Sequence, residues 1–184
     1  MGWCRLPNRV QMKRSMLALV FAFLLASSPA VLTAKERGLE KVLLVHVTTL
    51  LDSDQDRTAL VFRVVAAGLK KGRHVILLFD AQGVASLKIG RWFGGHSTPI
   101  DRVLISPQDR KDLAAMLGTA PEEIPDIYGS LLAFLKGRGA EVCASKRALE
   151  MAGLWPDRFD QIAEPATEER MLELFGRANA YLAY

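Results

Sequence analysis

Hydrophobic residues fall into short runs separated by polar and glycine-rich breaks, which is typical of alternating strands and helices. The continuous apolar runs 41–48 and 74–79 predict two strands that are buried on both faces. Between them, apolar residues at helical spacing over 58–71 predict a helix that Gly72 ends. A strand, a helix and a strand in this order predict a parallel βαβ unit with a right-handed crossover.

The same alternation continues to the end of the chain. The remaining elements follow from capping residues and apolar periodicity: helices after Ser106, Pro125, Ser145 and Thr167, a short helix at 85–89, and strands near 139–145, 161–163 and 179–184. The expected fold class is therefore α/β, a three-layer α/β/α arrangement around a mostly parallel, five-stranded, flavodoxin-like sheet.

The first 34 residues have a different pattern. Basic residues and no acidic ones occur before Ser15, an almost unbroken apolar run covers 16–26, and small residues follow. This order predicts a secretory signal peptide, with cleavage after Ala30 or Ala34. We therefore expect a signal peptide at 1–34, a single domain at 35–184, and an exported, periplasmic or extracytoplasmic protein. Since the apolar run is short for a membrane span, an uncleaved signal acting as an anchor is the alternative.

The signal peptide changes the meaning of the net charge. The whole chain has 24 basic and 20 acidic residues, a formal charge of +4. Residues 1–34 contain four of the basic residues and none of the acidic ones, so the mature part is neutral. A neutral domain lacks the basic surface that nucleic acids require, so we expect no nucleic-acid partner and no membrane contact except through an uncleaved signal.

Cleavage also removes Cys4 and leaves Cys143 as the only thiol of the mature chain. No intramolecular disulfide can then form, which leaves a buried inert thiol, an intermolecular link or a reactive site. We find no spacing of His, Cys, Asp and Glu typical of a metal site and no dinucleotide-binding motif. We therefore expect neither a metal nor a cofactor.

Cys143 is the leading catalytic candidate because it lies between a predicted strand and a helix that Ser145 caps. Unpaired N–H groups and the positive end of a helix dipole stabilise a thiolate, and Lys146 and Arg147 add positive charge. This arrangement predicts a lowered pKa for the thiol. The alternative is a buried cysteine that serves as a small apolar core residue.

Three candidates, Cys143, Thr48 and Asp80, fall at the ends of predicted strands. Sites in parallel α/β sheets lie beyond the carboxyl ends of the strands, so we expect a site at this edge. Ser145 is a further candidate binding residue. His96, in a glycine-rich loop, is another: it either approaches Cys143 as a base or is simply solvated.

Four segments of the chain resemble the DsrE/DsrF-like family of small sulfur-handling proteins. They are KVLLVHVTT, AAGLKKGRHVILLFDAQGV, LLAFLKGRGAEVCASKRALEMAGL and ANAYLAY, which together extend over roughly 41–184. The resemblance implies a three-layer α/β fold that is usually oligomeric. It also implies that Cys143 occupies the position of the cysteine that carries a persulfide between partner proteins in sulfur-relay members.

We accordingly expect an exported DsrE-like protein that handles sulfur or thiols through Cys143, as a homo-oligomer with a sulfur donor or acceptor protein as partner. The alternative is a non-catalytic binding or assembly module on the same fold, which the irregular insert 89–117 favours. A thiol oxidoreductase is a third hypothesis, which requires a second thiol from a partner because the mature chain has only one.

Overall fold

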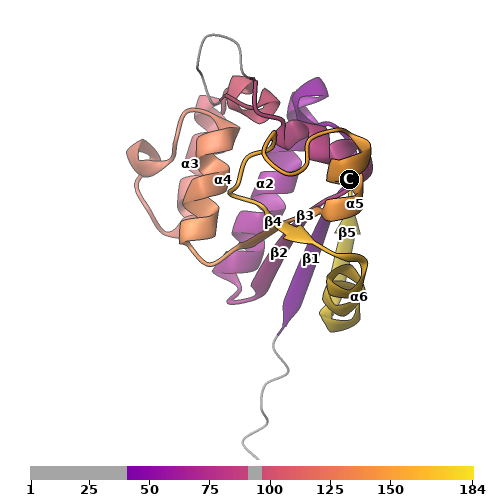
Figure 1. Cartoon of the computed structure of the whole chain (residues 1–184). Coiled ribbons are helices and arrows are strands. Elements are labelled where there is room, and N and C mark those ends of the chain that lie inside the picture. Colours follow the sequence, from indigo (N-terminus) through magenta and orange to yellow (C-terminus); the bar gives the residue numbers. More distant parts are fainter. Residues whose placement is uncertain (1–40, 91–96) are drawn as a thin grey trace, which may run out of the picture. The chain divides into compact units, whose positions relative to one another are not determined.

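The computed structural model describes residues 41–90 and 97–184, so the predicted signal peptide at 1–34 and the candidate His96 lie outside the described residues. The described chain forms one parallel sheet in the order β4-β3-β2-β1-β5 (Figure 1). Its strands are β1 (Val42–Val47), β2 (His74–Phe79), β3 (Glu141–Ser145), β4 (Glu164–Ala166) and β5 (Ala180–Ala183). The predicted α/β class and the number of five strands are confirmed.

Helices connect these strands. They are α2 (Gln55–Lys70), α3 (Pro107–Leu117), α4 (Tyr128–Gly137), α5 (Lys146–Met151) and α6 (Glu168–Arg177), with the 3₁₀ segments η1 (Leu51–Ser53), η2 (Ala81–Leu87), η4 (Pro99–Arg102) and η5 (Pro121–Glu123). Over the described residues, the helices are all too short or too polar to span a bilayer.

Capping residues fix where the helices begin. The side chains of Ser106, Ser145 and Thr167 each accept a hydrogen bond from the backbone N–H three residues further on, as predicted. Helix α2 begins earlier than its apolar periodicity indicates because Asp54 caps it. The cap, rather than the first apolar residue, therefore sets the start of each of these helices.

Three predicted elements are displaced. The short helix expected at 85–89 is the 3₁₀ segment η2, and the strand expected near 161–163 is β4, three residues later. Helix α4 begins at Tyr128 instead of Pro125, because Asp126 and Ile127 pair with the extended chain at Leu104 and Ile105. Long-range backbone pairing thus overrides the helix-start signal of the proline.

The connections between strands decide which helix covers which face. From β1 to β4 each crossover steps in one direction across the sheet, whereas the step from β4 to β5 returns past all the other strands. Because crossovers are right-handed, the returning helix α6 must lie on the opposite face from α2 and α4. The sheet is therefore covered on both faces, the third layer being α6 (Figure 1).

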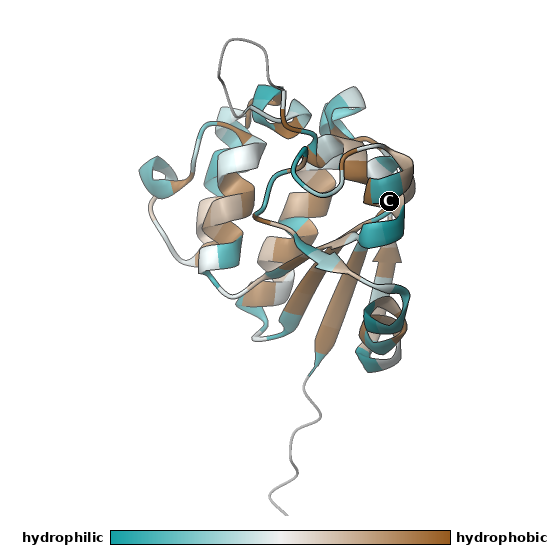
Figure 2. Ribbon diagram, viewed as in Figure 1, coloured by the Kyte–Doolittle hydropathy of each residue, from teal (hydrophilic) through white to brown (hydrophobic). Residues whose placement is uncertain are grey.

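The core is divided accordingly. The larger cluster joins alternate strand residues such as Val45 and Leu77 to helices α2 and α4. The smaller cluster, on the other face, joins Leu44, Leu78 and Cys143 to Leu174 of α6. Figure 2 shows β1 and β2 coloured as hydrophobic along their length, whereas α6 is mostly hydrophilic. Helix α6 is thus a narrow cover over an apolar sheet face.

The described part of the insert, 97–117, adds to the layer of α2. Arg63 of α2 pairs with Asp109 and Asp112 of α3 at N–O distances of 3.8 and 3.4 Å. Helix α3 therefore packs beside α2, whereas η4 of the same insert contacts η1 and η2, the segments that follow β1 and β2.

Candidate functional site

A pocket lies at the carboxyl edge of the sheet, with a volume of about 660 Å³, and we call it the carboxyl-edge pocket. Its walls come from η2 and α5, and most of them are small apolar side chains. The lining residues are Leu50, Asp80, Ala81, Gln82, Val84, Ala85, Ser145, Arg147, Ala148, Met151 and Ala152. Its size and mainly apolar walls, with a few polar side chains, are those of a small-molecule site.

Asp80 is the acidic group of this pocket. It follows β2 directly and caps η2, since its Oδ1 accepts a hydrogen bond from the N–H of Ala81 at 2.8 Å. Its Oδ2 lies 3.3 Å from Nε2 of His46, and this second contact holds the carboxylate in place. Ala81 adopts a φ of +46°, which is unusual for a residue with a Cβ. Strained backbone of this kind occurs often at functional sites.

Ser145 and Arg147 form the opposite end of the polar lining. Ser145 is buried, and its hydroxyl oxygen accepts the N–H of Ala148, so it holds the start of α5 in place. Arg147 is exposed at the pocket and has no ion-pair partner within the described residues. The structure therefore brings two sequence-predicted candidates, Asp80 and Ser145, into one pocket and adds the guanidinium of Arg147 to them.

Thr48 follows β1 as predicted but does not line the pocket. Its N–H and its hydroxyl both donate to the backbone oxygen of Tyr184, at 2.7 and 2.8 Å. These hydrogen bonds join the chain after β5 to the chain after β1, so the role of Thr48 seen in the structure is structural. Whether it also binds a ligand stays a prediction.

Cys143 lies inside β3, paired with Leu78 on one side and Glu164 on the other. Its side chain belongs to the small cluster beneath α6, whereas α5 packs into the cluster of the opposite face. Cys143 is only 2 % exposed. Of the two alternatives, the structure therefore has the buried cysteine and not a thiol at the start of a helix, because α6 covers the face to which the side chain points.

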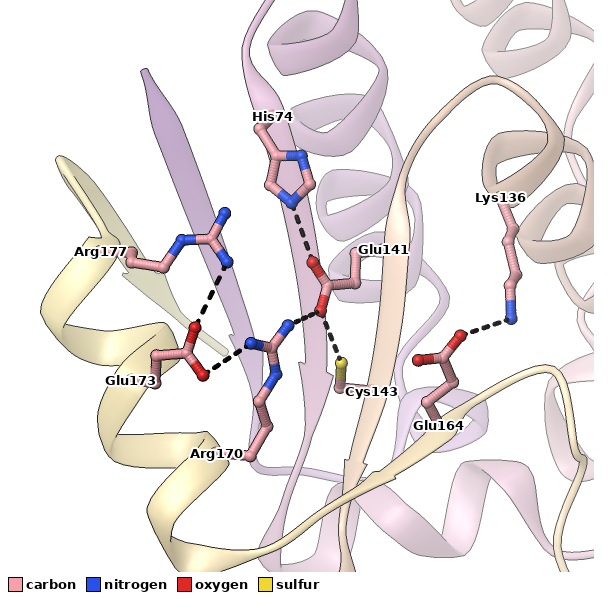
Figure 3. A network of polar contacts seen from close by, with 8 residues as sticks. All are labelled: His74, Lys136, Glu141, Cys143, Glu164, Arg170, Glu173 and Arg177. Atoms are coloured by element: carbon pink, nitrogen blue, oxygen red, sulfur yellow. Dashed lines mark hydrogen bonds and ion pairs between the residues drawn. The ribbon is translucent and has the colours of Figure 1, made fainter. Parts of the chain in front are cut away.

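A polar network covers the thiol (Figure 3), and we call it the Cys143 network. The Sγ of Cys143 donates to Oε1 of Glu141 at 3.5 Å, and Arg170 of α6 donates to the same oxygen at 2.7 Å. The other carboxylate oxygen of Glu141 lies 2.9 Å from Nε2 of His74. Through Glu141, Arg170 thus ties α6 to β3 and to His74 of β2, and its second ion pair, with Glu173, lies within α6.

These surroundings disfavour a thiolate. The pKa of Cys143 is raised to about 12, first by burial and then by the negative charge and hydrogen bond of Glu141. Lys146 pairs instead with Glu150, and Arg147 lines the pocket. The predicted lowering of the thiol pKa by these cations and the helix dipole is thus wrong. The charges with the largest effect on the thiol are carboxylates, which raise its pKa.

Glu141 is the charged centre of the network. Its burial raises the pKa of the carboxyl, but hydrogen bonds from His74 and Arg170 outweigh this, and the net pKa is lowered. Glu141 therefore stays ionised and holds the guanidinium over the thiol. Over the described residues, no three His, Cys, Asp or Glu side chains lie close enough together to hold a metal ion.

The side chains that contact the candidates Asp80 and Cys143 could not be predicted from local sequence patterns. His46 of β1 hydrogen-bonds Asp80 and also Tyr181, which lies 135 residues away. Glu141 and Arg170 were not singled out, although they decide the state of Cys143. The alternation of Glu141 and Cys143 along β3 places them on one face, and this was the one signal in the sequence that could have linked them.

No protein-family model matches this chain, and no curated protein matches it. Among solved structures, the chain is similar to the ychN protein from E. coli, with 13% sequence identity and a TM-score of 0.47. The match covers 79% of this chain and 99% of that chain. A likeness at this level carries no argument about activity, and membership of the DsrE/DsrF-like family remains a proposal.

Proposed function

We propose that this protein is a binding module on a DsrE-like α/β fold, which takes up a small molecule in the carboxyl-edge pocket. The observation that carries the proposal is the pocket itself, about 660 Å³ in volume, at the edge where parallel sheets bind their ligands. The only described thiol is buried away from it. Binding, rather than thiol chemistry, is thus the activity that the geometry favours.

The lining defines the class of ligand. Alanines and Met151 supply an apolar surface, and Arg147 supplies a positive charge without an ion-pair partner within the described residues. Such a site favours a molecule with an apolar body and one acidic group, which the guanidinium binds by charge-assisted hydrogen bonds. Gln82 and Asp80 are available to hydrogen-bond polar groups near the other wall.

The test uses anilinonaphthalene sulfonate, a fluorescent probe with an apolar body and one anionic group. The wild-type protein should bind it saturably. Ala152→Trp, which fills the pocket from an exposed position of its wall, should abolish binding, and Arg147→Gln should weaken it several-fold. Ala115→Trp, at an exposed position of α3 outside the pocket, is the matched control. Equal probe binding by Ala152→Trp and the wild type would disprove the proposal.

The second candidate is sulfur handling by Cys143 as a persulfide carrier. One observation favours it: the buried Sγ of Cys143 donates a hydrogen bond to Glu141, which Arg170 of the single covering helix α6 also contacts. Displacement of Arg170 by a partner protein would uncover the sulfur. The thiolate would then attack a sulfane sulfur of the donor, form the new S–S bond and release the remainder of the donor as a thiol.

Mass spectrometry after incubation with a sulfane-sulfur donor tests this candidate. A carrier should gain one sulfur on Cys143, and should gain it faster in Arg170→Ala, which removes the covering guanidinium. Arg138→Ala, an exposed arginine of another helix, is the control for loss of a positive charge. Persulfide formation only after denaturation would leave the binding module as the sole candidate.

Export and self-association complete the proposal. The order of basic, apolar and small residues in 1–34 supports a secretory signal. N-terminal sequencing of the protein recovered from the cell envelope should find a start at Val31 or Lys35. The family resemblance supports a homo-oligomer, for which light scattering of the mature protein is the direct measurement.

A further inference from the structure

A group of three titratable side chains begins at Asp80 in the wall of the pocket, continues away from it, and is separate from the Cys143 network. Asp80, His46 and Tyr181 are connected in series: Asp80 Oδ2 lies 3.3 Å from Nε2 of His46, and His46 Nδ1 lies 2.9 Å from the Tyr181 hydroxyl. We call them the Asp–His–Tyr series. They come from the ends of β2, β1 and the edge strand β5 (Figure 1).

The chemistry of the three groups fixes the direction of the hydrogen bonds. An ionised carboxylate only accepts hydrogen bonds, so the Nε2 of a neutral His46 carries the proton and donates to Asp80. Nδ1 is then unprotonated and accepts the hydroxyl proton of Tyr181. The tautomer that Asp80 selects is therefore the one in which the imidazole is a base toward the phenol.

Packing holds this geometry. His46 is only 8 % exposed, and the ring of Phe175 lies edge-on to it with a centroid distance of 5.5 Å. The same Phe175 ring lies 5.8 Å from that of Tyr181. Tyr181 itself is 50 % exposed. A fixed, buried base thus backs a phenol that reagents in solution can reach.

We propose that Tyr181 is a nucleophilic tyrosine that accepts an acyl group from an activated carboxylic ester. A carboxylate, an imidazole and a hydroxyl in series are the groups that perform acyl transfer with a serine hydroxyl. Here a phenol takes the place of the serine. His46 is its general base, and Asp80 is a positioning residue that holds the imidazole.

The step balances with the groups present. The Tyr181 oxygen attacks the ester carbonyl carbon and its O–H bond breaks, with the proton passing to Nδ1 of His46. The single bond between the carbonyl carbon and the oxygen of the leaving group then breaks, and the leaving group departs as an alkoxide or phenolate. The product is an O-acyl tyrosine beside an imidazolium, whose charge Asp80 balances until water takes the proton.

The test uses para-nitrophenyl acetate on the full protein, with acetylation located by peptide mass spectrometry. Tyr181 should be acetylated about tenfold faster, or more, than the model compound N-acetyltyrosinamide, because general-base catalysis contributes roughly 10²–10⁴-fold in enzymes. Tyr184, whose hydroxyl bonds no protein group within the described residues, is the internal control and should not exceed the model rate. A Tyr181 rate equal to that of the model compound overturns the proposal without any variant.

Variants then assign the roles. His46→Gln should reduce the Tyr181 rate to that of the model compound. Asp80→Asn should lower it several-fold, and Asp80→Glu, which restores the carboxylate, should recover part of the loss. Recovery by the conservative variant distinguishes positioning of the imidazole from general support of the fold, and a rate unchanged in folded His46→Gln contradicts the assignment. None of these readouts depends on whether the carboxyl-edge pocket binds a ligand.

Discussion

The carboxyl-edge pocket and the Cys143 network each include a residue of β3, and these residues, Ser145 and Cys143, are two positions apart. The two regions nevertheless offer opposite chemistry. Ser145, at the end of the strand, lines an open pocket with apolar walls and the guanidinium of Arg147, which has no ion-pair partner among the described residues. Cys143, inside the strand, lies under α6 and beside a carboxylate. The comparison shows that position along a parallel strand decides whether a residue reaches the carboxyl edge. The crossover that returns to β5 decides whether a side chain on the other face is covered.

The largest expected difference concerns thiol reactivity. Because the pKa of Cys143 is raised to about 12, native protein should alkylate at this residue about a thousandfold more slowly at pH 8 than denatured protein, whose thiol has an ordinary pKa near 8.5. Timed iodoacetamide labelling with peptide mapping measures the ratio. A native rate within tenfold of the denatured rate would contradict the cover by α6.

A substitution at Gly83 should destabilise the protein near the carboxyl-edge pocket. A Cβ at this position would clash with the backbone carbonyl of Val47, whereas one at Gly137 meets nothing. Gly83→Ala should therefore cost about 2–3 kcal/mol of unfolding free energy, as other overpacking substitutions do. Gly137→Ala, the matched control, should be neutral or slightly stabilising. Urea unfolding of both variants gives the comparison.

Substitutions at two helix caps, Ser145 of α5 and Thr167 of α6, should distinguish the pocket from the Cys143 network. Removing the capping oxygen with Ser145→Ala or Thr167→Ala should cost about 1 kcal/mol in each case. Only Thr167→Ala loosens α6, so only this variant should speed the alkylation of native Cys143. If both variants speed it equally, global unfolding rather than movement of α6 exposes the thiol.

The smallest effect is a dependence on pH. The folded protein holds the pKa of Glu141 below its ordinary value, so this group stabilises the fold above about pH 4.3, the unfolded value. That stabilisation is lost as the pH falls through the lower, folded pKa. Glu141→Gln should be less stable near pH 7, and its unfolding free energy should fall less than that of the wild type between pH 5 and about pH 3. Parallel curves for both proteins would show that Glu141 is not the group responsible.

Local sequence patterns determined much of this protein. Apolar runs predicted β1 and β2, and the caps Ser106, Ser145 and Thr167 predicted helix starts that the structure reproduces. These signals are reliable because capping and periodicity depend on residues within one or two turns of one another. They were sufficient for the α/β class and for placing Asp80 at the carboxyl edge of the sheet, but they also placed Cys143 at that edge, whereas it lies inside β3.

Only the tertiary structure decided the state of each candidate side chain. Cys143 is covered because the last crossover reverses direction and brings Arg170 to Glu141, 29 residues away in the sequence. His46 gains a phenol 135 residues away because β5 pairs with β1. Burial and hydrogen bonding set the pKa of a thiol and the tautomer of an imidazole, and both depend on neighbours that the strand order selects. No pattern along the chain contains that order, so the sequence could predict the strands and helix starts, whereas the fold determined the surroundings of each candidate side chain.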